Sequence, residues 1–149
     1  MDSEKIKQAP YFMKMRINGK PIFGMHRSGV TINLCPKLFV QGLNLETYPV
    51  TEEINMLQGT FSISCAAKAN VRVGEISKEM EFYIYDQDEI IIIGMDFGPQ
   101  FDLILDPRNG ILQRTNEGLI TIPTTKEKIT RAVRQWNEEK KIVKPISIR

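Results

Sequence analysis

The fold is decided by the stretch Phe23-Gly24-Met25-His26-Arg27-Ser28-Gly29-Val30-Thr31. Residues 11–17 before it alternate apolar and polar side chains, which is typical of a strand. Asn18-Gly19 is the dipeptide favoured in tight hairpin turns, and residues 20–25 return as a second strand. The stretch is therefore predicted to be a loop that leaves the second strand of a hairpin.

A second landmark is the apolar run Ile90-Ile91-Ile92-Ile93-Gly94-Met95-Asp96-Phe97. A continuous apolar run that ends in glycine predicts a buried strand with close backbone packing. Asp96 is predicted to cap a short helix that follows. Residues 101–105, 106–110 and 111–112 then predict a strand, a turn and another strand.

Together these segments resemble the retroviral-type aspartic proteases, the retropepsins, over residues 11–113. In that family an apolar strand runs into Asp-Thr/Ser-Gly-Ala-Thr. Ser28, Gly29 and Thr31 match this pattern, Val30 replaces a small residue, and Arg27 stands at the position of the catalytic aspartate. The resemblance implies a mostly β, retropepsin-like acid-protease barrel with short helices. It also implies a homodimer, because each chain of this size supplies half of the cleft.

The residue at position 27 decides what the resemblance implies about chemistry. Two close carboxylates share a proton in an aspartic protease; one activates a water and the other protonates the substrate carbonyl. Arginine stays protonated and has no acceptor atom, so it supports neither step. We therefore expect a degenerate loop, Arg27, Ser28, Gly29 and Thr31, with no catalytic residue, no enzyme activity and no cofactor.

The expected function is a catalytically inactive module of retroelement origin that forms homodimers and binds a protein or an extended peptide. The residues expected to contact the partner are His26, Arg27, Ser28 and Gly29. One alternative is an aspartic endopeptidase whose aspartate has been substituted at position 27. Another is a purely structural dimerisation module.

Other parts of the domain are predicted from local patterns. Pro36 suits the first turn of a short helix and Gly42 its end. Residues 44–58 are expected to be irregular, and strands are expected at 61–65, 70–76 and 80–85. The family has a glycine-rich flap in this region, but residues 66–70 contain no glycine, so a working flap is not expected.

The domain is preceded by a lead-in, residues 1–10, and followed by an extension, residues 114–149. The extension is expected to contain a strand at 119–122 and a helix that begins with a capping box at Thr124. Its apolar stripe consists of Ile129, Ala132, Val133 and Trp136. The helix is expected to pack on its own domain or to form an interface through Ile129, Val133 and Trp136.

Composition limits the remaining function classes. The chain has 149 residues, 42% hydrophobic and 26% charged, which is typical of a globular domain. A net charge of +2 indicates neither nucleic acid nor a membrane surface. With no apparent signal peptide or transmembrane run, an intracellular location, cytoplasmic or nuclear, is expected. Cys35 and Cys65 lack metal-ligand spacing, so no metal site and two free thiols are expected.

Overall fold

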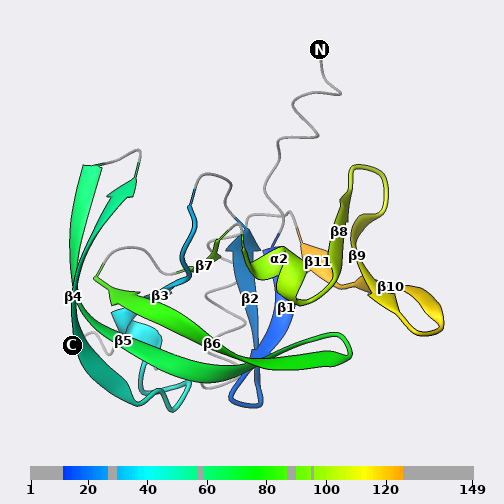
Figure 1. Ribbon diagram of the computed structural model, residues 1–149. Helices are drawn as coiled ribbons and strands as arrows, with labels where there is room; N and C mark the ends of the chain where they lie inside the picture. Colours follow the sequence, from blue (N-terminus) through cyan, green and yellow to red (C-terminus); the bar gives the residue numbers. More distant parts are fainter. Residues whose placement is uncertain (1–11, 27–29, 57–58, 87–89, 95, 126–149) are drawn as a thin grey trace, which may run out of the picture.

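A computed structural model describes residues 12–26, 30–56, 59–86, 90–94 and 96–125 of the chain. Six of its strands close into a barrel (Figure 1). In order around the ring they are β1 (Phe12–Ile17), β2 (Lys20–His26), β7 (Ile91–Ile93), β3 (Leu34–Pro36), β6 (Ile76–Tyr85) and β5 (Gly59–Val73). The ring closes because β1 also pairs with β5. The prediction of a mostly β barrel is confirmed.

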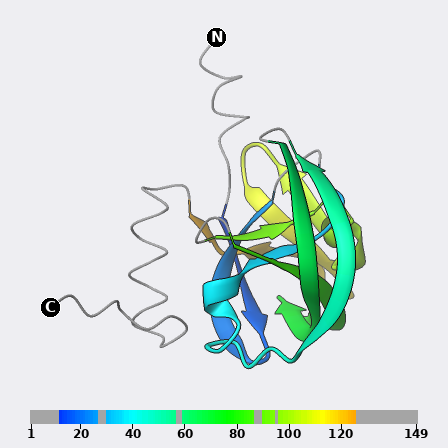
Figure 2. The same ribbon diagram turned by 90° about the vertical axis from the view of Figure 1, so that its left-hand side faces the viewer.

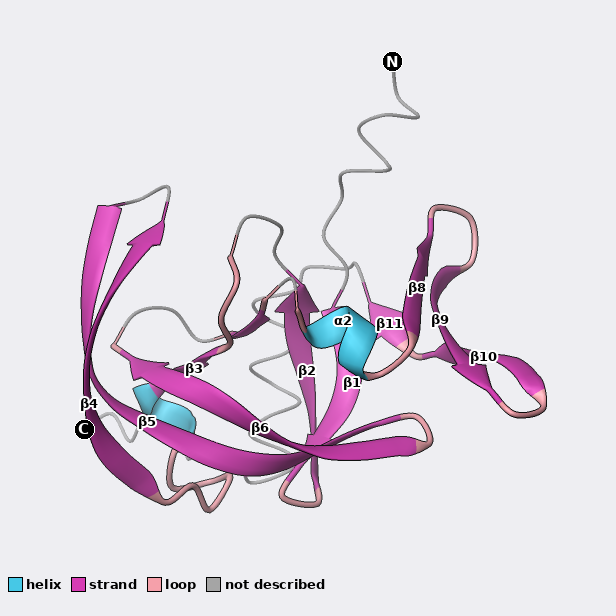
Figure 3. Ribbon diagram, in the orientation of Figure 1, coloured by secondary structure: helices cyan, strands magenta, loops and turns pink. Residues whose placement is uncertain are grey.

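Further elements flank the barrel. β4 (Thr47–Met56) extends the sheet beyond β5, and β11 (Thr124–Thr125) pairs with β1. A separate three-stranded sheet contains β8 (Leu103–Asp106), β9 (Gly110–Thr115) and β10 (Gly118–Ile122). The helices of the described residues are short: η1 (Lys37–Phe39) and α2 (Phe97–Gln100) (Figure 3).

The first hairpin forms as the sequence predicts. Asn18 and Gly19 both have positive φ, at 50° and 81°, as a tight two-residue turn requires. Alternate side chains of β1 point into the barrel, where Met13, Met15 and Ile17 are buried. The predicted turn after Asp106 and the strand at 119–122 are also confirmed, by the β8–β9 hairpin and by β10.

Two apolar clusters hold the fold together. The larger joins the inward side chains of the barrel to α2 and the second sheet; it includes Met13, Ile22, Val71, Phe82, Ile91, Phe97, Phe101, Ile111 and Ile122. The smaller cluster, called here the outer cluster, includes Phe12, Met25, Val30, Leu34, Ile63, Tyr85, Ile90 and Ile92. Strand alternation separates them: along β7, Ile91 and Ile93 belong to the first cluster and Ile92 to the second.

The region between residues 44 and 76 differs from the prediction. β4 occupies most of the segment expected to be irregular, and β5 is one strand where two were expected. Figure 2 shows β4 and β5 curving together along one side of the barrel. Most side chains of β4 are exposed, so it lacks the apolar alternation that marks a half-buried strand. The two predicted strands merge because Ala66, Ala67 and Ala69 fill buried positions of β5.

Three smaller expectations were wrong. Gly42 does not end the short helix, because η1 ends at Phe39 with Val40 as its C-cap. Asp96 occupies the N-cap position of α2, but its side chain makes no capping hydrogen bond. Thr124 pairs with Met13 in β11, so it does not cap a helix.

Several predictions concern residues outside the described ranges, namely the lead-in 1–10 and the helix with Ile129, Ala132, Val133 and Trp136. The described part of the extension continues the second sheet, since β9 crosses residue 113 and pairs with β10. A domain boundary at residue 113 stays a prediction. Among the described residues, no helix is long and apolar enough to cross a membrane.

Candidate functional site

The structure describes both ends of the candidate loop but not its centre. His26 is the last residue of β2 and pairs with Ile93. Val30 is buried and Thr31 is exposed. Arg27, Ser28 and Gly29 lie outside the described residues.

β7 pairs with both strands that flank this loop, β2 and β3. β2 pairs with β7 in parallel, and β3 pairs with β7 antiparallel through Leu34 and Ile92. Because β7 lies between β2 and β3, the chain must cross the end of β7 to pass from His26 to Leu34. The two sequence landmarks, separated by about sixty residues in the chain, therefore meet at one place in the fold.

Gly94, just after β7, touches the backbone of the loop. A Cβ built on Gly94 would lie 2.6 Å from the carbonyl oxygen and 2.7 Å from the nitrogen of Ile32. Neither is a flexible side chain, so a larger residue would displace the loop. The predicted close backbone packing at this glycine is confirmed.

Asn33 secures the outgoing end of the loop. Its Oδ1 accepts a hydrogen bond of 3.0 Å from the Gly94 N–H, and its Nδ2 donates to the Glu81 carbonyl at 3.2 Å. Its own carbonyl accepts a bond of 2.9 Å from the Tyr83 N–H. The sequence analysis missed this residue, and the only signal was a polar side chain between the apolar Ile32 and Leu34.

His26 lies at the incoming end, against a cavity of about 160 Å³. The other lining residues are almost all apolar: Met13, Ile93, Phe97, Gly98, Pro99, Leu103, Leu105 and Ile111. Partial burial lowers the pKa of His26, because desolvation disfavours the charged imidazole. His26 therefore presents a neutral, hydrogen-bonding group in apolar surroundings at physiological pH.

The outer cluster is a buried apolar cluster on the other side of β2, and Ile32, Val50 and Ile54 pack against it as partly buried side chains. Val30 and Ile32 from the loop belong to it, as do Leu34 and Ile92 from the strands beneath. The β4–β5 hairpin contributes Val50, Ile54 and Ile63 to the same cluster. In Figure 1 this hairpin and the described part of the loop project from the same end of the barrel. The hairpin tip lies between Met56 and Gly59, so the expectation of a tip at residues 66–70 was wrong.

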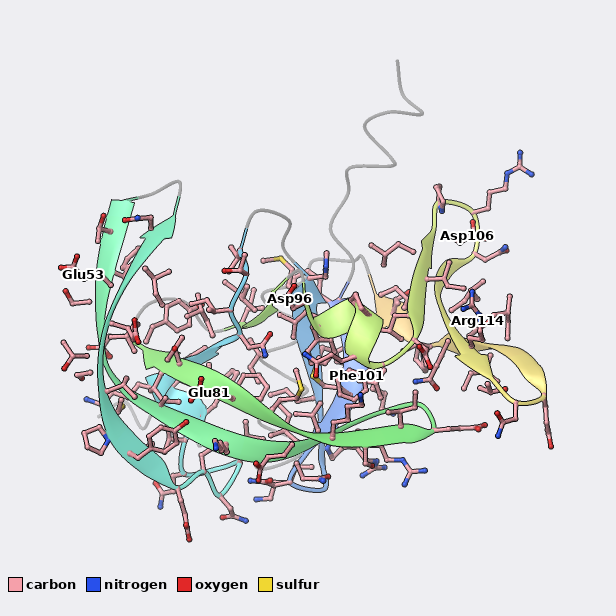
Figure 4. The ribbon with its side chains drawn as sticks, in the orientation of Figure 1. Glu53, Glu81, Asp96, Phe101, Asp106 and Arg114 are labelled. Carbon is pink, nitrogen blue, oxygen red and sulfur yellow. The ribbon has the colours of Figure 1, made fainter. Side chains whose placement is uncertain are left out.

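Glu52 and Glu53 of the hairpin are both exposed. Figure 4 shows Glu53 pointing away from the barrel and Asp96 at the start of α2. The Tyr48 hydroxyl donates to the Glu81 carboxylate, and this bond is the main reason that the pKa of Tyr48 is raised to about 12.

No group of three or more metal-ligating side chains occurs within the described ranges.

Neither cysteine contributes a reactive group to this surface. Cys35 is buried, and burial raises the pKa of its thiol, so the thiolate is disfavoured. Cys65 is partly buried on β5, and both thiols are free, as predicted.

Comparison with known proteins finds a similar fold among solved structures. No family model matches the chain, and no curated protein matches it. Among solved structures, the retroviral protease-like domain of Ddi1 from Leishmania major superposes with a TM-score of 0.58 at 16% identity. The match covers 81% of this chain and 98% of that domain.

A second similar structure is EIAV protease, complexed with the inhibitor HBY-793. It superposes with a TM-score of 0.51 at 13% identity, over 59% of this chain and 84% of the viral protein. At such identities the likeness concerns the fold alone. The closed barrel, the crossing of the loop over β7 and these superpositions together establish that the chain has a retropepsin-like fold.

Proposed function

We propose that this chain is a catalytically inactive retropepsin-like domain that forms homodimers and binds an extended peptide. The observation that carries the proposal is the set of partly exposed apolar side chains that borders the outer cluster, Ile32 of the loop and Val50 and Ile54 of the β4–β5 hairpin. This surface lies beside a loop whose sequence has Arg27 where the family has its catalytic aspartate.

The loss of catalysis follows from the properties of arginine. A guanidinium remains charged across the workable pH range, so it does not accept a proton from water. The described neighbours of the loop do not replace the missing acid: Val30 is apolar, Thr31 is a weak acid, and His26 faces an apolar cavity. We propose that the domain descends from a retroelement protease and has kept its fold for binding.

An extended peptide suits the shape and chemistry of this surface. Val50 and Ile54 from the hairpin and Ile32 from the loop, which are partly exposed, would contact its apolar side chains. The backbone of such a peptide would pair with strand edges, as in other cases of strand addition. His26, Arg27, Ser28 and Gly29 would contact the peptide at the centre of the site.

The homodimer is supported by exposed apolar side chains on the second sheet. Leu105 and Leu119 are each 57% exposed, and Leu105 also lines the cavity beside His26. Exposed apolar side chains close to a partly open cavity are a feature of interaction surfaces. The second copy would bring another loop towards this one and complete the binding surface.

Binding and cleavage are tested on the same peptides. The native chain and Ile54→Asp are incubated with a library of extended peptides that carry apolar side chains. We expect the native chain to retain peptides without cutting them and Ile54→Asp, a change at a partly buried position, to retain none. Leu38→Asp, at an exposed apolar position of η1 outside both the outer cluster and the second sheet, is the matched control and should retain the peptides.

Each alternative has its own outcome. Cleavage by the native chain that a transition-state inhibitor of aspartic proteases blocks would establish the endopeptidase. A dimer that binds none of the peptides would leave a purely structural dimerisation module.

A further inference from the structure

A cavity of about 610 Å³, called here the η1 cavity, lies between η1, the β4–β5 hairpin and the end of β6. Leu38 lines it from η1, Thr47 and Cys65 line it from the hairpin, and Ile84 lines it from β6. Its volume is within the range of about 300–1,000 Å³ that small-molecule sites occupy in proteins. The proposed peptide surface makes no use of it, because Tyr85 alone, of the described residues that line the cavity, belongs to the outer cluster.

The cavity forms where β6 loses the strands on both of its sides. In the direction of the hairpin tip, β5 pairs with β6 only as far as Ala66 and Tyr83, and beyond that point it pairs with β4. On the other side, β3 pairs with β6 as far as Pro36 and Tyr85, where the chain turns into η1. Side chains of η1, β5 and β6 surround the space that is left, so the cavity is a consequence of the strand pairing.

The described lining is mainly apolar. Ile84 is buried in the larger cluster, and Val40 and Cys65 are partly buried against that cluster. Leu38 is 46% exposed and extends the same apolar lining towards solvent. A ligand in contact with these side chains would remove apolar surface from water, and such burial favours binding.

The charged residues of the described lining, Lys37 and Asp86, have opposite signs. Each follows the last residue pair of the β3–β6 ladder, so their backbones leave the sheet next to each other, and both are exposed. An anion that approaches Lys37 is repelled by Asp86, and a cation that approaches Asp86 is repelled by Lys37. Gln41 and Thr47 add uncharged groups that donate and accept hydrogen bonds. The lining therefore favours a ligand without net charge.

We propose that the η1 cavity is a binding site for a neutral, mainly apolar small molecule that carries hydrogen-bonding groups at its edge. One apolar side chain of a partner protein would fill only part of the cavity, whereas a drug-sized molecule fills such a volume. The apolar body contacts Leu38, Val40 and Ile84, and Gln41 and Thr47 bond its polar edge. Binding here is independent of the proposed peptide binding, because these five residues lie outside the outer cluster.

Nile red, a neutral dye that brightens in apolar surroundings, is the probe for the full chain. We expect the native chain to bind it, and to bind the anionic dye anilinonaphthalene sulfonate about tenfold more weakly. Leu38→Asp should weaken Nile red binding by about tenfold, because the new carboxylate loses hydration against the dye. Ser64→Asp is the matched control: it adds the same charge at an exposed position beside Cys65, outside the described lining, and should bind Nile red as the native chain does.

Cys65 reports whether the dye occupies this cavity. Its thiol is free and partly buried in the lining, whereas Cys35 is buried. Nile red should slow the alkylation of Cys65 by iodoacetamide in proportion to the fraction of the chain that holds dye, with the modified residue identified by mass spectrometry. Cys35 should stay unmodified with and without the dye.

Three outcomes would each overturn the proposal: no dye binding by the native chain, equal dye affinity of Leu38→Asp and Ser64→Asp, or alkylation of Cys65 at one rate with and without dye. Equal or tighter binding of the sulfonate dye would overturn the assignment to a neutral ligand. Leu38→Asp should still retain the peptides, so failure of the cavity and failure of the proposed peptide site are distinguishable.

Discussion

Gly94 and Asn33 join the two halves of the site, because the Gly94 N–H donates to Asn33 Oδ1 at 3.0 Å and the loop backbone lies where a Cβ on Gly94 would be. The hydrogen bond and the close approach act at the same point. The bond holds β7 to the start of β3, and the missing side chain lets the loop cross above it. A substitution at either residue should therefore displace the loop backbone.

Gly94→Ala should destabilise the chain by about 1–3 kcal/mol, the usual cost of overpacking. The new Cβ would lie 2.6 Å from the Ile32 carbonyl oxygen, so the backbone must move. Urea denaturation measures the effect. Gly98→Ala is the matched control, because a Cβ there meets nothing within 4 Å and should cost under about 0.5 kcal/mol. Equal midpoints for the two variants would contradict the close contact.

A second prediction concerns Gln113, which is 0% exposed and joins the second sheet to the barrel. Its Nε2 donates to the Val73 carbonyl at 2.7 Å and the Phe101 carbonyl at 3.1 Å. Its Oε1 accepts from the Glu75 N–H at 2.9 Å. Gln113→Leu keeps a similar volume but removes all three bonds, and each buried group left unpaired costs about 1–3 kcal/mol.

Gln113→Leu should therefore lower the free energy of unfolding by more than a single lost hydrogen bond would. Denaturation of native and variant chains measures this, with Thr115→Val as the control, because the Thr115 hydroxyl bonds an exposed turn. A variant as stable as the native chain would show that water or a shift of the β5–β6 turn replaces the three bonds.

The fold was predictable where the chain carries its own local signal. Asn18-Gly19 fixes the first hairpin through backbone conformation, and the Ile91–Ile93 run identifies a buried strand by composition. β4 was not predictable because its side chains are mostly exposed and its partner β5 determines its conformation. Asn33 and Gln113 were missed for a related reason, since their partners lie 61 and 40 residues away in the chain.

A third prediction follows from His26, the one histidine of the chain. Burial lowers its pKa in the folded state below the usual value of 6.5. In the window between these two pKa values the unfolded chain binds more protons than the folded chain, so folding stability decreases as pH falls through it. Above 6.5 the imidazole is neutral in both states, and below the folded pKa it is charged in both states. The change of stability with pH that His26 causes is therefore confined to this window, and the stability lost there stays lost at lower pH.

His26→Leu should remove this part of the pH dependence, because leucine does not titrate. Denaturation of both chains between about pH 5 and 8 isolates the contribution as a difference, since the carboxylates common to both chains cancel. We expect the native chain to lose stability relative to the variant as the pH falls below 6.5. A constant difference across the range would show that the imidazole is fully solvated.

The last prediction concerns Arg27 in the proposed homodimer. If the two loops meet at a two-fold axis, two guanidinium groups approach there, and neither changes its charge with pH. Arg27→Asp replaces them with two carboxylates, which at short range share one proton and titrate as a pair. The variant dimer should therefore be tightest where one proton is shared and should weaken as the pH rises and both carboxylates ionise. Sedimentation equilibrium of both chains between about pH 4 and 8 measures this, and Arg108→Asp, on the exposed β8–β9 turn, controls for the change in net charge. A native chain that stays monomeric at high concentration, or an identical pH profile for Arg27→Asp and Arg108→Asp, would place Arg27 away from the two-fold axis.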